Sequence, residues 1–240
     1  MFIKKISQKN IFISIVLISI LLLSLDAVAR AGGGGGSGGG GGFGGRHGYG
    51  IGIFKLILFI LWGIYTAIIS FLVFIKSGWS KRIISRASQT DKVWNLDEMK
   101  NHSERVFRQM QDAWSSRELS QVRDIITQSL FDDYAEKLDA MRMNNERNIL
   151  RDIDIDEIKI IGCRDYKDNS KDSFIAYIKG TILDYTVDDR TGNTIKNENQ
   201  NNEKFTDTYY FHRSENKWLL NFIDNDVNLL DVVIATSYKE

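Results

Sequence analysis

The pattern of apolar and polar positions divides the chain into two uninterrupted apolar runs and a long segment of mixed character. The longer run covers residues 51–75 and carries a single charge, Lys55. Roughly 20 consecutive apolar residues are enough to cross a bilayer. The pattern therefore predicts one transmembrane helix at 51–75.

The shorter run, residues 11–25, lies close to the N-terminus. Lys4, Lys5 and Lys9 precede it, and the small residues Ala27 and Ala29 follow it. A basic head, a short apolar core and small residues at alternate positions are typical of a secretory signal peptide. We therefore expect residues 1–29 to be a signal peptide cleaved after Ala29, with an uncleaved first membrane helix as the alternative.

The segment between the two runs is dominated by glycine. Residues 32–52 hold 15 of the 20 glycines in the chain. No apolar side chains recur there to offset the entropy lost on ordering. We assign residues 30–50 as a glycine-rich flexible linker.

Basic residues follow the longer run, at Lys76, Lys81, Arg82 and Arg86. Basic residues beside a membrane span favour its cytoplasmic side, so the pattern predicts that the C-terminal part of the chain is cytoplasmic. In this basic juxtamembrane segment, residues 76–92, the same four side chains are candidate contacts for anionic lipid headgroups. A plain positively charged flank without a lipid role is the alternative.

Beyond residue 92, apolar residues first recur at helical spacing. They predict three helices. The first, with Asn95 or Asp97 as its cap, has the apolar positions Met99, Val106, Met110 and Trp114. The second, capped by Ser116, has Leu119, Val122, Ile125, Ile126 and Leu130. The third has Phe131, Tyr134, Leu138 and Met141, and ends near Asn144.

From Ile153 the apolar period changes to two, which indicates strands. The pattern slips near Glu157, as a β-bulge would cause. Further strands are indicated around Phe174 to Ile182, Phe205 to Phe211 and Trp218 to Phe222. Short connections between these segments predict a four-stranded antiparallel meander with the helices on one face. Residues 93–240 are therefore expected to form one α+β domain.

Several motifs in this region resemble the Tim44-like domain family. They include Phe107-x6-Trp114, Tyr134-x3-Leu138, Asn148-x-Leu150 and Tyr209-x-Phe211-x-Arg213-x4-Trp218. The family's usual Gly-Asp before the second helix is replaced here by Ser116-Arg117. The resemblance covers about half of the chain, from Phe107 to Asn225, and its motifs are mostly core positions.

The resemblance implies a cone-shaped fold, similar to nuclear transport factor two, with three helices on a curved four-stranded antiparallel sheet after one transmembrane helix. In relatives the domain is discussed as a module that contacts membrane lipid and docks proteins. The concave face of such a sheet often encloses an apolar pocket. The candidate pocket lining is Phe107, Met110, Trp114, Ile178, Ile182, Tyr209, Phe211, Leu220 and Phe222.

No catalytic constellation is visible. Asp152, Asp154 and Asp156 alternate as a half-exposed strand requires, and Asp184 lies at a strand end where we expect solvation. The three histidines and the lone Cys163 have no metal-ligand spacing, and Cys163 is expected to be buried. We therefore expect neither metal nor cofactor. From residue 93 onward there are 20 basic and 29 acidic residues, which disfavours nucleic acid as a partner.

These features predict a non-enzymatic adaptor in the bacterial inner membrane, possessing a cytoplasmic domain that binds an unidentified protein partner or lipid in protein transport or membrane biogenesis. Two alternatives remain open. One is an enzyme of the same fold with a pocket acid or base. The other is a structural membrane protein whose domain only oligomerises.

Overall fold

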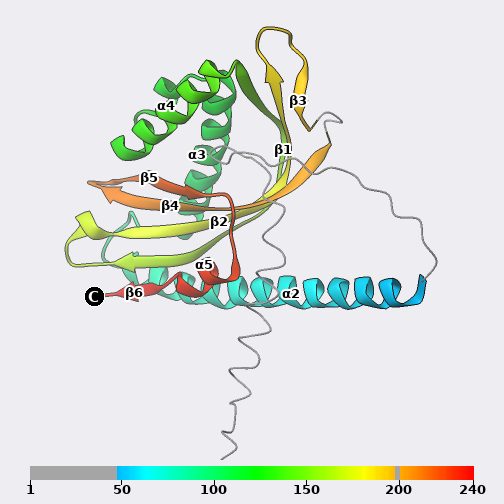
Figure 1. Cartoon of the computed structure of the whole chain (residues 1–240). Helices are drawn as coiled ribbons and strands as arrows, with labels where there is room; N and C mark the ends of the chain where they lie inside the picture. The colour runs from blue at the N-terminus through cyan, green and yellow to red at the C-terminus, as the bar shows by residue number, and fades with distance from the viewer. Residues whose placement is uncertain (1–47, 198–200) are drawn as a thin grey trace, which may run out of the picture. The chain divides into compact units, whose positions relative to one another are not determined.

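The computed structural model describes residues 48–197 and 201–240 (Figure 1). The predicted signal segment, 1–29, and residues 30–47 of the predicted linker lie outside the described residues. The described residues divide into two units between Phe71 and Leu72. The first unit holds residues 48–71, and the second holds everything from Leu72 onward.

The first helix, α2 (Gly48–Ala87), contains 40 residues and crosses the boundary between the units. Its length is about 60 Å, well beyond the roughly 30 Å of a bilayer's hydrocarbon core. Within the described residues, Lys55–Ala87 is the stretch long and apolar enough to span a membrane. Phe59 and Trp62 are exposed on it. One continuous helix therefore contains the predicted span and most of the predicted juxtamembrane segment.

Helix α3 (Leu96–Ser116) confirms the first predicted helix of the domain. The Asn95 side chain accepts hydrogen bonds from the backbone N–H groups of Asp97 and Glu98, which satisfies donors that the helix itself leaves free. The helix ends at Arg117, whose backbone is left-handed with a φ of 59°. A left-handed residue stops a helix because its N–H turns back to earlier carbonyls, here those of Ala113 and Trp114.

The predicted second helix is wrong, so the domain begins with two α-helices rather than three. Residues Leu119–Val122 form only the 3-10 turn η1, and Ser116 is the last residue of α3. The chain then becomes extended, with the Leu220 N–H donating to the Ile125 carbonyl at 2.8 Å and the Thr127 N–H to the Leu220 carbonyl at 2.9 Å. Consecutive β-branched residues at 125–127 favour this extended backbone.

Helix α4 (Gln128–Met143) confirms the last predicted helix. The Thr127 hydroxyl accepts from the Leu130 N–H and caps its start. Leu130, Tyr134 and Leu138 are its buried residues, and the helix ends before Asn144 as the sequence predicts.

The sheet contains six strands rather than the predicted four. They are β1 (Glu146–Asp165), β2 (Ser173–Asp188), β3 (Thr194–Lys196), β4 (Asn202–Ser214), β5 (Lys217–Asp224) and β6 (Ser237–Lys239). The order is β5-β4-β2-β1-β6, with β3 paired to β2. The predicted antiparallel pairing of the long strands is confirmed, but β6 runs parallel to β1, so the sheet is mixed.

The two additional strands are only three residues long, which is too short to produce a period. Two other short elements were not anticipated either. The 3-10 turn η2 (Asn169–Lys171) joins β1 to β2, and the helix α5 (Leu229–Ile234) lies between β5 and β6.

Irregularities in β1 curl the sheet strongly. Its pairing with β2 shifts at Arg151/Asp154, at Ile155/Glu157 and at Ile160/Gly162. The second shift confirms the slip predicted near Glu157. Each bulge bends the strand and increases its twist, so helices α3 and α4 can both pack against β1.

The hydrophobic core lies between these helices and the sheet, and it includes the end of α2. Ile84 and Ala87 are buried in the same cluster as Trp94, Phe107 and Leu220. The compact part of the chain therefore starts before residue 93, within the apolar helix itself.

Gly180, in the middle of β2, provides a test of the close packing between strands. A Cβ atom at this position would lie 2.1 Å from the Asp154 carbonyl oxygen, where β1 bulges towards β2. We expect Gly180→Ala to destabilise the protein by about 1–3 kcal/mol or more, because backbone must move to accept the methyl group. Thermal unfolding of the full chain in detergent micelles, followed by circular dichroism, would measure the effect.

Gly78→Ala is the matched control, because nothing lies within 4 Å of its Cβ position and it occupies a helix. Its unfolding midpoint should be unchanged or slightly raised. Equal midpoints for the Gly180 variant and the parent would contradict the strand register described above.

Candidate functional site

The residues predicted to line a pocket are core residues, apart from one. Phe222 is 52% exposed on β5, and its ring lies 5.4 Å from that of Tyr210. The others are at most 4% exposed: Phe107, Met110, Trp114, Ile178, Ile182, Tyr209, Phe211 and Leu220. All eight belong to the hydrophobic core cluster, so the predicted pocket between helices and sheet is corrected to a packed core. Phe211 also lines a small cleft of about 230 Å³ at the other side of the strands.

Ring contacts fill the space that the prediction left for a ligand. Phe107 stacks on Phe205 with ring centroids 5.1 Å apart, and it also contacts Tyr209 at 5.5 Å. The Tyr209 hydroxyl accepts a hydrogen bond from Gln111 Nε2 at 3.0 Å. Aromatic pairs at these separations are favourable packing contacts in their own right.

Two residues that carry the family resemblance form a buried polar chain. Trp114 Nε1 donates to Asn148 Oδ1 at 3.0 Å, and Asn148 Nδ2 donates to Asp184 Oδ1 at 2.6 Å. Asp184 is therefore buried and hydrogen-bonded, which corrects the expectation that it is solvated. The chain connects α3, β1 and β2, so these residues hold the helix against the sheet.

Two clefts lie beside the C-terminal part of α2. One, of about 510 Å³, is lined by Lys81, Ile84, Ser85, Ser88, Lys92, Trp94, Asn95, Leu96 and Asp97. The other, of about 450 Å³, is lined by Phe74, Ile75, Ser77, Gly78, Trp79, Lys81, Arg82 and Lys159. Both combine apolar side chains with cations, a combination that suits an amphiphilic or an acidic and partly apolar ligand.

The four basic residues predicted to contact lipid headgroups have different environments. Lys76 is half-buried, and its Nζ donates to the backbone carbonyls of Val233 and Ala235. Lys81, Arg82 and Arg86 are exposed. Only these three are available to a headgroup, since Lys76 is engaged within the protein.

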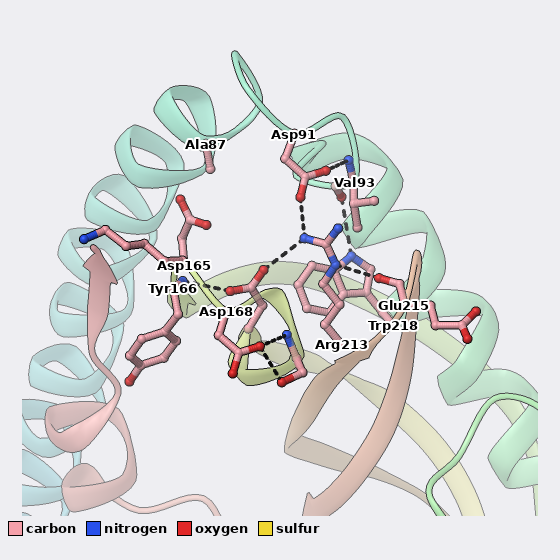
Figure 2. Close-up of polar contacts among 12 residues, drawn as sticks. Ala87, Asp91, Val93, Asp165, Tyr166, Asp168, Arg213, Glu215 and Trp218 are labelled. Carbon is pink, nitrogen blue, oxygen red and sulfur yellow. Dashed lines mark hydrogen bonds and ion pairs between the residues drawn. The ribbon is translucent and has the colours of Figure 1, made fainter.

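Arg213, at the end of β4, is the centre of a buried charge cluster (Figure 2). Its Nη1 donates to Asp172 Oδ2 at 3.0 Å and to Asp91 Oδ2, while its Nε donates to the Glu215 carbonyl at 2.8 Å. The other Asp172 oxygen accepts from the Tyr166 N–H at 2.8 Å. The cluster fastens the segment that follows α2 to the loops at one end of the sheet.

Burial and pairing act in opposite directions on these charges. Burial raises the pKa of Asp172, opposed by hydrogen bonds from the Tyr166 N–H and from Arg213. Burial also lowers the pKa of Arg213, but the bonds and charges of Asp91 and Asp172 outweigh it and leave that pKa raised. The arginine therefore stays charged, and its two carboxylates stabilise it in that state.

An aromatic cluster covers the charge cluster. Trp94 packs edge-on against Trp218 at 5.0 Å, and Trp218 packs edge-on against Phe174 at 4.9 Å. Trp218 Nε1 donates to the Val93 carbonyl at 3.4 Å (Figure 2). Trp218 therefore belongs to the core, and Arg213 binds carboxylates beside it.

Cys163, on β1, is buried as predicted and faces α2. Its thiol donates a weak hydrogen bond to the Ser80 carbonyl, with 3.7 Å between sulfur and oxygen. The Ser80 hydroxyl in turn lies 2.8 Å from that of Ser237 on β6. These contacts join α2, β1 and β6 near the C-terminus.

The alternating acidic residues of β1 face solvent. Asp152, Asp154 and Asp156 are exposed, which confirms the prediction for that strand. Within residues 48–197 and 201–240, no group of three His, Cys, Asp or Glu side chains is placed to hold a metal ion.

Comparison with known families agrees with this arrangement. A family model described as the Tim44-like domain matches residues 80–225, more than half of the chain. The protein belongs to the Tim44-like domain family. The match starts inside α2, so it includes Ile84 and Ala87. It also includes the three charged residues of the cluster, Asp91, Asp172 and Arg213. Membership suggests a membrane-associated role related to protein transport, and the long apolar helix is consistent with membrane association.

One solved structure similar to the Tim44-like domain here is the intermembrane space region of the chloroplast protein ARC6. The identity is 8% and the TM-score is 0.37, over 52% of this chain and 95% of that one. No curated protein sequence matches the chain.

The Arg213 cluster leads to a stability prediction. Arg213→Met should destabilise the protein by about 3–5 kcal/mol, because it leaves the fully buried Asp172 carboxylate without its cation. Adding Asp172→Asn should recover part of this loss, since the double variant removes the unpaired charge as well. Denaturant unfolding followed by tryptophan fluorescence would measure all three proteins.

Lys171→Met is the control, because Lys171 pairs with Asp168 on the surface of the neighbouring turn. An exposed pair contributes about 0–1 kcal/mol, so this variant should unfold almost as the parent does. Similar losses for Lys171→Met and Arg213→Met would mean that the buried pairing is not what holds this region together.

Cys163 leads to a prediction about pH. Burial raises its pKa to about 11, with hydrogen bonds to Ser237 and Ser80 opposing the shift. Only the thiolate reacts, and at pH 8 roughly one thiol in a thousand is then ionised. Alkylation of the native chain should be at least about a hundred-fold slower than in denaturant and should rise about ten-fold per pH unit up to pH 10. A native rate that levels off near pH 8.5 would contradict the burial.

Proposed function

We propose that this protein is a membrane-anchored, non-enzymatic adaptor whose Tim44-like domain holds a protein partner beside the membrane in a transport-related process. The single observation that carries the proposal is the burial of Ile84 and Ala87, from the end of the apolar helix, in the core of the domain. The end of the apolar helix is therefore part of the domain's own core. Whatever the domain binds is kept close to the end of α2.

The chemistry beside α2 supports binding rather than catalysis. The cleft of about 510 Å³ places Lys81 and Lys92 beside the apolar side chains of Ile84 and Leu96. A peptide segment with acidic and apolar residues would satisfy both parts of this surface. Exposed Lys81, Arg82 and Arg86 add attraction for anionic lipid, about 1 kcal/mol for each basic residue near a membrane surface.

The basic residues after the apolar run also support an orientation with the Tim44-like domain in the cytoplasm of a bacterium and the span in its inner membrane. A cleaved signal peptide at 1–29 would leave α2 as the anchor. The cytoplasmic orientation and the cleavage of the signal peptide are both part of the proposal.

One observation favours the enzyme alternative to a limited degree. Asp207, on β4, is buried, and its charge adds to the effect of burial in raising the pKa values of Tyr134 and Tyr209. However, Tyr209 is fully buried and Asp207 is 2% exposed, so a substrate has no route to them in this conformation. We therefore propose that these groups are structural.

Site-specific photo-crosslinking in native membranes would test the adaptor. A photoreactive residue would replace Ser88, which lines the larger cleft and is exposed, or Met143, which is 84% exposed at the end of α4. We expect a discrete protein adduct from position 88 and none of that mass from position 143. Lys92→Glu should remove the adduct, because the new carboxylate would repel an acidic partner.

The orientation has a separate test. A reporter fused after Glu240 should be active in the cytoplasm.

Adducts only between two copies of this chain would support the oligomerising alternative instead. Activity of the reporter outside the cytoplasm would overturn the orientation. Turnover of a small molecule that Asp207→Asn abolishes would contradict the adaptor and favour the enzyme.

A further inference from the structure

The short helix α5 (Leu229–Ile234) is apolar on both of its faces. Leu229 and Val232 are buried, whereas Leu230, Val233 and Ile234 are 56%, 46% and 63% exposed. Its start is well formed, because Asn228 and Asp231 make a reciprocal capping box. A defined helix therefore presents a contiguous apolar face that the rest of the described chain does not cover.

The contacts of α5 place it at the end of the apolar run. Lys76 is the first charge after the uncharged residues 56–75, and its Nζ donates to the Val233 carbonyl at 2.7 Å and to the Ala235 carbonyl. One carbonyl is in the last turn of α5 and the other is at its C-cap, where a cation is favoured by the helix dipole. Figure 1 shows α5 and β6 alongside the C-terminal part of α2.

We propose that the exposed face of α5, formed by Leu230, Val233 and Ile234, lies in the interfacial layer of the bilayer that α2 crosses. The inference rests on the membrane anchoring proposed above. A lysine at the end of a membrane span is costly to bury unless acceptors satisfy it, and α5 supplies those acceptors at that depth. The apolar face of α5 then lies beside Lys76, where the uncharged residues of α2 end.

Neighbouring side chains fit the same location. Phe74 and Trp79, on either side of Lys76 in α2, are exposed, as is Tyr238 of β6. Tryptophan and tyrosine are typical of the membrane–water interface, where an amphipathic ring is partly in lipid and partly in water.

The expected contact is with the acyl and glycerol region of lipid rather than with a particular headgroup. The exposed face carries no basic residue, and the acids Asp224, Asp226 and Asp231 lie close to one another near the start of α5. Insertion should therefore occur in zwitterionic lipid and be insensitive to salt. This separates it from any electrostatic contact made by Lys81, Arg82 and Arg86.

Depth-dependent fluorescence quenching in the full chain would test the proposal. Ile234→Cys and, separately, Leu230→Cys would carry an environment-sensitive fluorophore in phosphatidylcholine nanodiscs. The background would be Cys163→Ala, repeated with Cys163 retained, since the buried thiol should not label near neutral pH. Met143→Cys, on an exposed residue at the end of α4, is the matched control.

We expect a lipid with a shallow spin label to quench the probes at 234 and 230 several-fold more than the probe at 143, and aqueous iodide to show the reverse order. High salt should leave both results unchanged. Iodide quenching at 234 equal to that at 143, without lipid quenching, would overturn the proposal. Shielding from both quenchers together with chain-to-chain crosslinks from 234 would also overturn it, in favour of contact with a second copy.

A probe on the span separates this inference from the proposed function. Ile64 is half exposed in the middle of the apolar run. If Ile64→Cys is quenched by deeply labelled lipid but the α5 probes are not, only the α5 contact fails. If Ile64→Cys is not quenched either, the membrane anchoring fails with it.

Discussion

A helix that is apolar enough to cross a bilayer must end somewhere, and its last apolar turns must then be removed from water. Here the domain provides the cover, because Ile84 and Ala87 are buried in the same core as Trp94 and Phe107. The hydrophobic effect thus attaches the end of the apolar helix to the domain. The rest of the structure depends on this shared burial, which makes the end of the apolar helix, from Leu72 onward, part of the same compact unit as the domain.

Buried polar groups then fix how the segment after the helix docks. Arg213 binds Asp172 and Asp91, and the Trp218 indole donates to the Val93 carbonyl. Burying the charges of Arg213 and Asp172 is costly, and their attraction repays the cost only in one geometry. Apolar packing alone would tolerate several arrangements of residues 88–95, whereas the charge cluster accepts one. We therefore regard the cluster as the element that gives this junction a single conformation.

The dense core also affects where function can reside. Phe107, Tyr209 and Phe211 fill the concave side of the sheet that the sequence pattern suggested for a ligand. The clefts beside α2 and the exposed face of α5 lie outside this core. Both surfaces adjoin the end of the apolar helix, so the proposed partner and the bilayer would be contacted by neighbouring parts of the Tim44-like domain.

The sequence alone determined the long elements, since their periods are set by residues close in the chain. The apolar helix at 51–75, helices α3 and α4 and the four long strands all followed from local spacing, and the family resemblance followed from motifs within these elements. Asn95 and Asp97 were both candidates for the cap of α3, and the structure decides for Asn95. The tertiary structure decided the rest. Residues 125–127 are extended because they pair with Leu220, and β6 exists because β1 offers it an edge. Asp91 and Asp172 meet Arg213 across 122 and 41 residues of sequence, a separation that carries no periodic signal. The sequence pattern also could not show that the predicted pocket residues are buried in a packed core. Apolar residues recur with the same period whether their side chains line a cavity or fill it.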